Sequence, residues 1–427
     1  MITEIQSHRA SSFFTPASIR TIEDTGLGVD FLSELVLKVV YYAGSIRGGQ
    51  VAQQIGLPFT GVTDRLLDTL RHQAFVEVKG GSSMFANSYE YAMTGKGSAK
   101  ALELIEKCTY AGVAPVPLSL YRQAVQGQAA GSTIGRDALI RALSHLVLSD
   151  KVLNQIGPAI NSGRSIFLFG PPGNGKTSIA EAAPDVLGGA VYVPYALEFD
   201  SQVIQVYDPT HHRQVGSNGQ QNDSTDRRWV LCRRPAVIAG GELTLSTLDL
   251  TYGESSRYYE APLQLKANNG VLLIDDFGRQ EVRPRDLLNR WIVPLEKRED
   301  YLNLQSGQRL NVPFEQLVIF STNMEPKSLV DEAFLRRIRY KIHVPDPTRD
   351  EYLEILRRVC QERGIPCDAA AQEYLFQYYA DRGIQPRGCH PRDLVDQLAD
   401  VSRYMGVEPR LTRDMLELAC DSYFVKL

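Results

Sequence analysis

Residues 165–183 read SIFLFGPPGNGKTSIAEAA, and this stretch decides the fold of the chain around it. Its first five residues are β-branched or aromatic and predict a short buried strand, and the residues from Lys176 onward predict a helix. Gly173 and Gly175 allow the connecting backbone to curl so that successive N–H groups point inward. Because the helix N-terminus adds its dipole, the loop is suited to hold phosphate oxygens. The stretch therefore predicts an α/β fold with a phosphate-binding loop.

The same loop predicts the contacts to a nucleoside triphosphate. Lys176 is expected to reach the β- and γ-phosphates, and the Thr177 hydroxyl is expected to bind Mg²⁺. ATP and Mg²⁺ are therefore the predicted cofactors. The predicted nucleotide-binding residues of the loop are Gly170, Pro171, Pro172, Gly173, Asn174, Gly175, Lys176, Thr177 and Ser178.

A second motif, GVLLIDDFGR, occupies residues 270–279. Its four apolar residues suit a buried parallel strand, and two acids follow at the carboxyl end, where open α/β sheets bind their ligands. Asp275 is expected to hold Mg²⁺ together with Thr177. Asp276 lies where a general base would orient or deprotonate the attacking water. The alternative is an acidic pair that caps a helix.

The order of these motifs resembles that of AAA+ ATPases over about residues 138–425. The resemblance implies a parallel-sheet α/β core, a C-terminal helical lid and ATP hydrolysis. In that family the second motif most often ends in Asp-Glu, whereas this chain has Asp275 and Asp276. The carboxylate of Asp276 is thereby withdrawn by one methylene group, which affects the expected rate of hydrolysis rather than nucleotide binding.

Residues 317–323, LVIFSTN, are a further apolar strand that ends in a polar residue. The stretch resembles the sensor-1 strand of AAA+ proteins. That resemblance implies that Asn323 hydrogen-bonds the γ-phosphate or the attacking water. The alternative is that Asn323 starts a turn before Glu325.

Arginines in two segments complete the resemblance. Residues 331–347 resemble the segment with the arginine finger, which implies Arg337, or its neighbour Arg336, as the group that crosses a subunit interface. Arg392 opens a helix at the position that matches the sensor-2 arginine of the lid, with Arg387 as the fallback. For each of them an ordinary surface ion pair is the alternative. Asn323, the arginine pair and the lid together argue against a metabolic P-loop kinase.

The N-terminal part has another pattern. Residues 31–107 predict three helices, the third at about 59–74, then two strand-like runs and a further helix. This order resembles a winged-helix domain, which implies possible DNA binding through the third helix. The stretch contains 8 Lys and Arg residues against 7 Asp and Glu residues. Since a DNA-binding face normally has a clear basic excess, a protein-docking role is favoured.

The composition shifts predict the domain boundaries. Pro115, Pro117 and the small residues that follow suggest a linker before the nucleotide-binding part. The expected division is an N-terminal arm over 1–30, a small α+β winged-helix-like domain over 31–111, a linker over 112–136, the α/β AAA+ domain over 137–347 and the helical lid over 348–427.

Two insertions interrupt the AAA+ pattern. The surplus in residues 200–265 contains Tyr258 and Tyr259, which are either substrate-gripping aromatics at a pore or tyrosines packed on their own hairpin. The adjacent His211 and His212 lack a third ligand, so we expect them to be exposed rather than to bind metal. Residues 301–314 predict a hairpin before the sensor-1 strand, which resembles the insertion of the MoxR-like branch.

Bulk composition agrees with a globular protein. The 427 residues contain 46 basic and 50 acidic side chains, so net charge alone does not suggest a nucleic-acid partner. The 6 cysteines have no close pair, which favours reduced thiols. No apolar run approaches the roughly 20 residues of a membrane span, and the N-terminus lacks a signal-peptide pattern, so we expect a cytoplasmic protein.

These patterns lead to one functional hypothesis and one alternative. The hypothesis is a MoxR-like AAA+ ATPase that assembles as a homo-oligomer, expected to be a hexamer, and remodels a protein partner chosen by residues 31–111. The alternative is an ATP-switched transcriptional regulator that binds DNA through the same residues.

Overall fold

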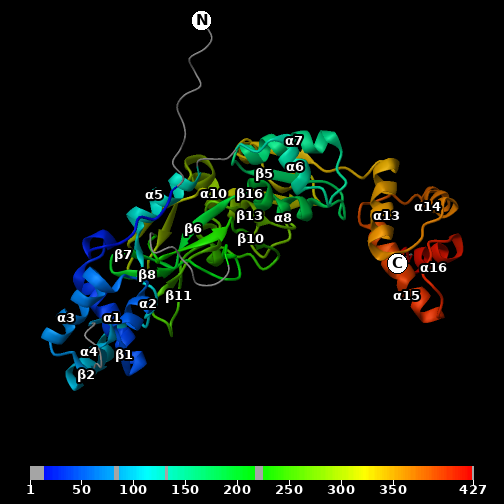
Figure 1. Ribbon diagram of the computed structural model, residues 1–427. Coiled ribbons are helices and arrows are strands. Elements are labelled where there is room, and N and C mark those ends of the chain that lie inside the picture. Colours follow the sequence, from blue (N-terminus) through cyan, green and yellow to red (C-terminus); the bar gives the residue numbers. More distant parts are fainter. Residues whose placement is uncertain (1–13, 81–85, 130–132, 217–224, 426–427) are drawn as a thin grey trace, which may run out of the picture.

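The computed structural model describes residues 14–80, 86–129, 133–216 and 225–425. Figure 1 shows the N-terminal helices at one end of the chain, the sheets in the middle and the C-terminal helices at the other end. The expected α/β class, with a parallel-sheet core and a C-terminal helical region, is confirmed. Among the described residues, no helix combines the length and the hydropathy that a membrane span requires.

The N-terminal unit packs helices around a small antiparallel sheet in the order β1-β3-β2. Its core is made by apolar side chains at helical spacing, among them Val36 of the first helix and Leu66 and Leu70 of the third. The elements are α1 (Val29–Ala43), β1 (Ser45–Arg47), α2 (Gly48–Ile55), α3 (Asp64–His72), β2 (Val76–Gly80), β3 (Glu90–Met93) and α4 (Gly95–Lys107).

The third helix begins later than the sequence indicates. The expected start was near residue 59, but Thr60 has an extended backbone and Gly61 a φ of 84°, so regular α-helix begins at Asp64. A Cβ on Gly61 would lie 2.6 Å from the carbonyl oxygen of Arg20. The close approach of the N-terminal segment therefore requires glycine here and interrupts the helix.

A second sheet, in the order β11-β12-β8-β7-β4, lies between the N-terminal unit and the parallel core. The range 112–136, which the sequence suggests is a linker, contains β4 and α5, and both contribute side chains to the core of this sheet region. Its elements are β4 (Val116–Pro117), α5 (Leu118–Ala129), β7 (Ala196–Phe199), β8 (Gln202–Gln205), β11 (Thr251–Tyr252) and β12 (Tyr259–Glu260), beside the pair β6 (Ala190–Pro194) and β9 (Trp229–Arg233).

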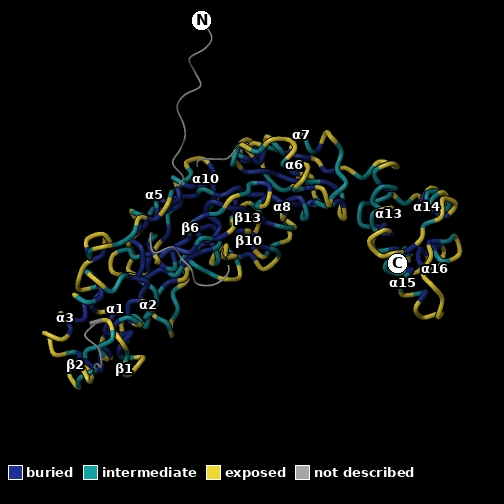
Figure 2. The backbone as a smooth tube through the Cα atoms, viewed as in Figure 1, coloured by how far each residue is buried: buried dark blue, intermediate teal, exposed yellow. Residues whose placement is uncertain are grey.

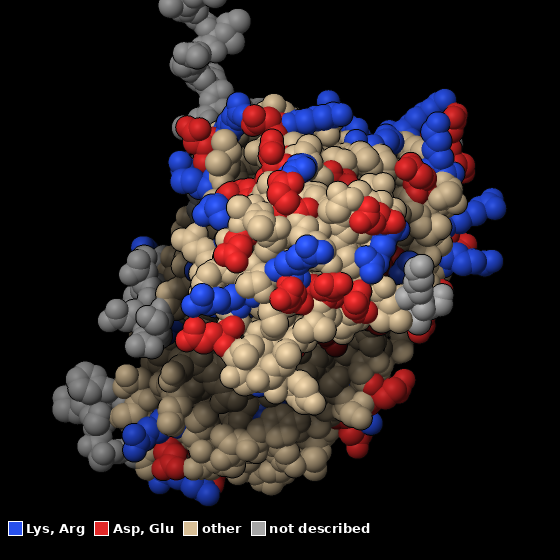
Figure 3. All heavy atoms as spheres, turned by 90° about the vertical axis from the view of Figure 1, so that its right-hand side faces the viewer, with Lys and Arg blue, Asp and Glu red and all other residues tan. Residues whose placement is uncertain are grey.

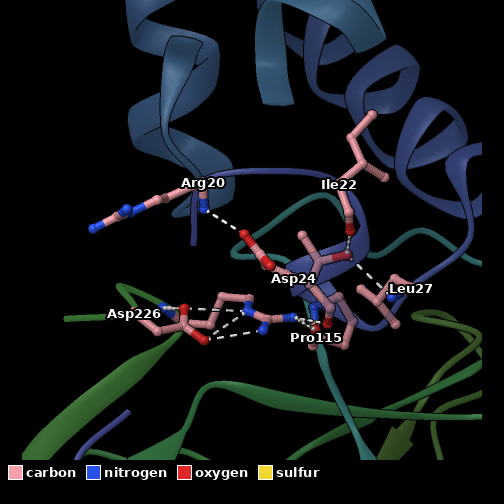
Figure 4. Close-up of polar contacts among 8 residues, drawn as sticks. Arg20, Ile22, Asp24, Leu27, Pro115 and Asp226 are labelled. Carbon is pink, nitrogen blue, oxygen red and sulfur yellow. Dashed lines mark hydrogen bonds and ion pairs between the residues drawn. The ribbon is translucent and has the colours of Figure 1, made fainter. Parts of the chain in front are cut away.

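A buried arginine joins the N-terminal unit to this second sheet region. Arg228 is fully buried and forms an ion pair of 2.9 Å with Asp226. Its Nη1 donates to the carbonyl oxygens of Thr25, at 2.8 Å, and Pro115, at 3.0 Å, and Figure 4 shows Pro115 and Asp226 on separate segments of the chain. Because a buried charge needs all its partners, this contact holds the two regions in one arrangement.

The core sheet has five parallel strands in the order β10-β13-β16-β5-β17. Helices cover both faces, which explains why the strands are apolar along their whole length. One face packs against α6, α7 and α8, and the other packs against α10 through Phe167, Phe320 and Trp291. The bounds are β5 (Ile166–Phe169), β10 (Ala236–Ala239), β13 (Val271–Ile274), β16 (Leu317–Thr322), β17 (Tyr340–His343), α6 (Arg136–Ala142), α7 (Asp150–Asn161), α8 (Lys176–Leu187) and α10 (Pro284–Lys297).

The predicted hairpin before β16 is present. Strands β14 (Glu299–Asn303) and β15 (Arg309–Pro313) pair in antiparallel register. The buried carboxylate of Asp300 on β14 is held by Arg290 of α10 at 2.6 Å. Short helices α9 (Leu263–Lys266), α11 (Pro326–Leu329) and α12 (Glu332–Leu335) connect the core strands.

The C-terminal region is a helical bundle with its own apolar core. Figure 2 shows buried residues inside this bundle, separate from those of the sheets. Its first helix starts at a capping box formed by Thr348 and Glu351. The helices are α13 (Arg349–Arg363), α14 (Ala369–Arg382), α15 (His390–Met405) and α16 (Arg413–Tyr423), and we refer to them as the lid.

Candidate functional site

The phosphate-binding loop connects β5 to α8 as the sequence predicts. Gly170, Gly173 and Gly175 all have positive φ, at 142°, 80° and 82°. A Cβ on Gly170 would lie 2.2 Å from the carbonyl oxygen of Val344. The loop can therefore lie against the end of β17 only because these positions are glycine.

Lys176 lies in the first turn of α8 with only 6% of its surface exposed. Its Nζ donates to the carbonyl oxygens of Gly170, at 3.0 Å, and Pro171, at 2.8 Å, and to Asn323 Oδ1 at 2.7 Å. Burial lowers the pKa of Lys176, and the nearby charges of Asp275 and Asp276 oppose that shift. In the described part of the chain this ammonium has no ion pair, so its charge is uncompensated although three neutral oxygens accept its three N–H bonds.

The two acids lie directly after β13, next to the loop. Thr177 Oγ1 lies 3.2 Å and 3.0 Å from the two carboxylate oxygens of Asp275 and donates its proton to them. Asp276 has a φ of 47°, which is uncommon for a residue other than glycine and is typical of functional sites. Asn323 Nδ2 donates to Asp276 Oδ1 at 3.3 Å. The side chain of Asn323 therefore links Lys176 to Asp276.

These residues line one cavity of about 460 Å³. The hydroxyl of Thr177 and the carboxylate of Asp275 supply the hard oxygen donors that Mg²⁺ prefers, so the residues present fit that ion. Gly170 and Pro171 of the loop do not line the cavity. The lining includes eleven residues expected from sequence, namely Pro172, Gly173, Asn174, Gly175, Lys176, Thr177, Ser178, Asp275, Asp276, Asn323 and Arg392.

Sequence reasoning missed the apolar wall of this cavity. Leu146, Val147 and Leu148 precede α7, and Ile355 and Val359 project from α13 of the lid. Such apolar side chains suit a flat heteroaromatic ring more than phosphate oxygens. No motif identifies them, because the core and the lid contribute them from positions about two hundred residues apart.

The lid arginines differ in position. Arg392 lines the cavity, its side chain is 67% exposed, and its only ion pair among the described residues is a long one of 3.7 Å to Asp393. Arg387 does not line the cavity, but its charge lies close enough to lower the pKa of Lys176. The structure thus places Arg392, the first choice from sequence, at the cavity.

The two candidates for an arginine finger lie after α12, away from their own cavity. Arg337 forms an ion pair of 2.6 Å with Glu296 of α10. Arg336 is exposed, and no ion pair involves it within the described residues. The sequence favours Arg337, whereas the geometry leaves the guanidinium of Arg336 free to contact another molecule.

The structure bears on two expectations about the insertion in residues 200–265. The expected exposure of His212 was wrong, and for Tyr259 one of the two alternatives is favoured. His212 is buried rather than exposed: its Nδ1 accepts from the N–H of Asp208 at 2.9 Å, and its Nε2 lies 2.9 Å from the Lys266 carbonyl oxygen. Tyr259 is 4% exposed, and its hydroxyl accepts from the N–H of Gln305 at 2.9 Å. Its ring also packs on Tyr252 of its own hairpin, with ring centroids 5.0 Å apart, which supports packing rather than substrate gripping.

Comparisons with known proteins match separate parts of the chain. The family model described as a domain of unknown function (DUF8689) matches residues 348–422, which are the lid. Spastin of Anopheles gambiae is 23% identical over 247 residues, which are 57% of this chain but only 24% of that protein. The chain therefore spans about a quarter of the length of this relative.

Two solved structures are similar to this chain at low sequence identity. NtrX from Brucella abortus has a TM-score of 0.42 at 16% identity, over 65% of this chain and 56% of its own. RuvB of Thermotoga maritima, a Holliday junction branch migration motor, has a TM-score of 0.36 at 15% identity, over 69% of this chain and 71% of its own. Both superpositions are loose.

Proposed function

We propose that this chain is a Mg²⁺-dependent ATPase of the AAA+ type. One observation carries the proposal: Asn323 bridges Lys176, at 2.7 Å, and Asp276, at 3.3 Å, in the cavity that also contains the Thr177–Asp275 pair. A basic group for phosphate, oxygen donors for a cation and a carboxylate for water therefore lie within one site.

Each residue has a role in the proposed reaction. The loop N–H groups and Lys176 bind the β- and γ-phosphates, and the apolar wall at Leu148 and Ile355 receives the base. Asp276 accepts a proton from water while the water oxygen bonds to the γ-phosphorus. The bond from that phosphorus to the bridging oxygen breaks, which yields ADP and inorganic phosphate. Mg²⁺, held through Thr177 and Asp275, would neutralise charge on the phosphate oxygens.

Two variants test the proposal. Lys176→Ala should abolish binding of a fluorescent ATP analogue, since it removes the buried ammonium. Asp276→Asn should bind the analogue normally but lose turnover by about 10²-fold or more, the usual contribution of a general base. Asp400→Asn, on the exposed surface of α15, is the matched control. Turnover by Asp276→Asn at the rate of the parent chain would remove Asp276 from the mechanism.

We further propose that the chain acts as a cytoplasmic homo-oligomeric ring, with a hexamer as the expected size. The support is Arg336, an exposed guanidinium that cannot serve its own cavity but would reach one in a neighbouring copy. Arg337 is the second candidate, and Arg392 is proposed to contact the γ-phosphate from the lid. Electron microscopy with a non-hydrolysable ATP analogue tests the assembly: particles that remain monomeric would contradict it.

The proposed role of the ring is to remodel a protein partner selected by the N-terminal unit. The β14–β15 hairpin before β16 supports the MoxR-like branch. Figure 3 shows Lys, Arg, Asp and Glu side chains interspersed on the lid side of the molecule, without a field of one sign. Such a mixed surface is suited to protein contacts more than to a polyanion.

DNA binding through a winged helix remains the second candidate. The order of α1, α2, α3, β2 and β3 supports it. The acidic residues of α3 argue against DNA binding. Arg71 is paired with Asp68 at 3.1 Å, and Asp64 lies one turn before Asp68. Salt-sensitive binding of the full chain to duplex DNA would favour the regulator, and no binding at low salt would exclude it.

A further inference from the structure

Asn174, the loop residue between Gly173 and Gly175, makes contacts that phosphate binding does not explain. Its side chain is 9% exposed, and it spans three separate segments of the chain. Nδ2 donates to the carbonyl oxygen of Pro345 at 3.1 Å and to the carboxylate of Asp346 at 2.8 Å. Oδ1 accepts from the N–H of Gly388 at 3.0 Å.

These partners are two of the places where the lid meets the core. Pro345 and Asp346 lie between β17 and α13, so they belong to the segment that connects the core to the lid. Gly388 lies just before α15, the helix that presents Arg392 to the cavity. A further contact joins Arg358 Nη1 of α13 to the carbonyl oxygen of Ser144 at 2.7 Å. One amide in the phosphate-binding loop is therefore bonded both to the connecting segment and to the loop before α15.

The backbone packing around Asn174 is equally close. A Cβ on Gly388 would lie 3.1 Å from the carbonyl oxygen of Gly173, and a Cβ on Gly173 would lie 2.4 Å from Cys389 Sγ. The lid loop thus rests directly on the phosphate-binding loop, and the lack of a Cβ on Gly388 and Gly173 permits this close contact. A small rotation of the lid must separate these atoms or move the loop with it.

The chemistry of the site selects asparagine. The amide supplies two N–H donors and a carbonyl acceptor, and its partners here are two acceptors and one N–H donor. Turning the amide over would set donor against donor and acceptor against acceptor, so its orientation is determined. An aspartate at this position would place its charge against Asp346, and a threonine lacks the reach to bond both segments.

We propose that Asn174 is a positioning residue that latches the lid onto the phosphate-binding loop and so couples lid angle to the hold on the nucleotide phosphates. The inference rests on the proposed ATPase function but concerns a different step. Opening the lid breaks the three hydrogen bonds of Asn174. The backbone N–H groups of the phosphate-binding loop can then move away from the nucleotide phosphates. Nucleotide release then depends on this latch, whereas the chemical step depends on Asp276 and Asn323.

Nucleotide release measures the latch. Stopped-flow dissociation of a fluorescent ADP should be about tenfold faster in Asn174→Ala, the order expected for lost hydrogen bonds to a charged group. Single-turnover hydrolysis of bound ATP should change much less, because the catalytic groups remain. Asn303→Ala, in an exposed position of β14, is the matched control. A release rate equal to that of the parent chain would overturn the proposal.

Exchanging the amide and the carboxylate between positions 174 and 346 distinguishes the hydrogen bond between these two side chains from a general packing effect. Asn174→Asp should release ADP faster than Asn174→Ala, since two carboxylates then face each other. Asn174→Asp combined with Asp346→Asn restores a donor to one side and a carboxylate to the other, while position 174 still accepts from Gly388. Release by the double variant should return towards the parent rate. If it remains as fast as in Asn174→Asp alone, the bonding between 174 and 346 does not control release.

Hydrogen exchange keeps the test independent of ATPase activity. Without nucleotide, amides of residues 389–396, at the start of α15, should exchange faster in Asn174→Ala than in the parent chain. If the chain bound no nucleotide at all, the proposed function would fail and this measurement would still decide on the latch. If Asn174→Ala changed neither the hydrogen exchange nor the release of ADP, the latch would be refuted, while the proposed ATPase function would be unaffected.

Discussion

Asn323 shows how a single side chain can define the site. Its carbonyl oxygen accepts from Lys176 and its amide nitrogen donates to Asp276, so one residue orients both a phosphate-binding group and a carboxylate. If Asn323 only started a turn before Glu325, its side chain would not need these two partners. The contacts therefore favour the sensor interpretation over a simple turn after β16.

Asp276 is the second residue on which the proposed chemistry depends. Its positive φ follows from the turn after β13, where the N–H of Phe277 donates to the carbonyl oxygen of Ser321 at 2.7 Å. This turn brings the short carboxylate to Asn323 despite the missing methylene group. The local backbone, rather than side-chain length, places the carboxylate.

His212 supports a prediction about acid stability. Burial lowers the pKa of His212 from its ordinary value of about 6.5 to about 4. The unfolded chain therefore takes up the proton first, and the stability that neutral His212 contributes is complete above the unfolded pKa. It is lost as the pH falls from about 6.5 towards 4, by about 2 kcal/mol at about pH 5.

Urea unfolding at several pH values measures this loss. A His212→Gln variant should be less stable near neutrality but should show a flatter decline between about pH 6.5 and 5, because one linked group is gone. His145→Gln, at an exposed position just before the cavity-lining Leu146, is the control for the replacement of a histidine. A decline in His212→Gln as steep as in the parent would show that His212 does not titrate in this range.

Neighbouring strands build the site at the scale of elements. β5, β13 and β16 lie side by side in parallel register, so their carboxyl ends meet at one edge of the sheet. The loop after β5, the acids after β13 and Asn323 after β16 are brought together by this arrangement alone. Their separation along the sequence therefore has little bearing on their distance in space.

Arg228 tests the joint between the N-terminal unit and the second sheet region. In Arg228→Met, Asp226 keeps its charge in a buried position without its partner, which should cost about 3–5 kcal/mol. Urea unfolding followed by tryptophan fluorescence is suitable, since Trp229 is adjacent. Arg403→Met, from an exposed pair with Asp400, should leave the midpoint unchanged.

A double variant completes this test. Asp226→Leu combined with Arg228→Met removes both charges and should recover part of the loss, as for other buried ion pairs replaced by apolar residues. If Arg228→Met alone unfolds at the midpoint of the parent chain, the buried pair does not hold the joint.

Ring assembly is the property of the whole molecule that the proposal requires. Arg336→Ala should bind ATP normally and lose turnover by about 10³-fold or more, the lower limit for an arginine finger. Arg339→Ala is the control, because Arg339 contacts the ring of Tyr340 in its own chain. Steady-state ATPase measurements at a concentration that supports assembly give both values.

Mixing two inactive variants distinguishes a finger in trans from a residue that acts in its own chain. Arg336→Ala subunits keep Asp276, and Asp276→Asn subunits keep Arg336, so mixed rings contain interfaces with both groups intact. Activity should therefore return on mixing. If the mixture remains as inactive as each variant alone, Arg336 does not complete a neighbouring site.

The sequence alone determined the parts of the site whose function depends on local backbone geometry. The glycines of residues 170–175 permit the positive φ values of the loop, and the apolar runs at 271–274 and 317–322 require burial on both faces of a sheet. The hairpin at 299–313 follows from alternation about a turn. Each of these patterns lies within a few neighbouring residues, and for that reason the sequence alone predicts the local structure.

Only the tertiary structure decided the contacts between distant segments. It placed Asn174 against the lid, buried His212 and gave the range 112–136 a strand and a helix. Among the described residues it left Arg336, rather than Arg337, without an ion pair. The reason is physical: whether a polar side chain pairs or stays free depends on which distant carbonyl or carboxylate packing brings to it. Packing is a property of the whole fold, and no local pattern records it.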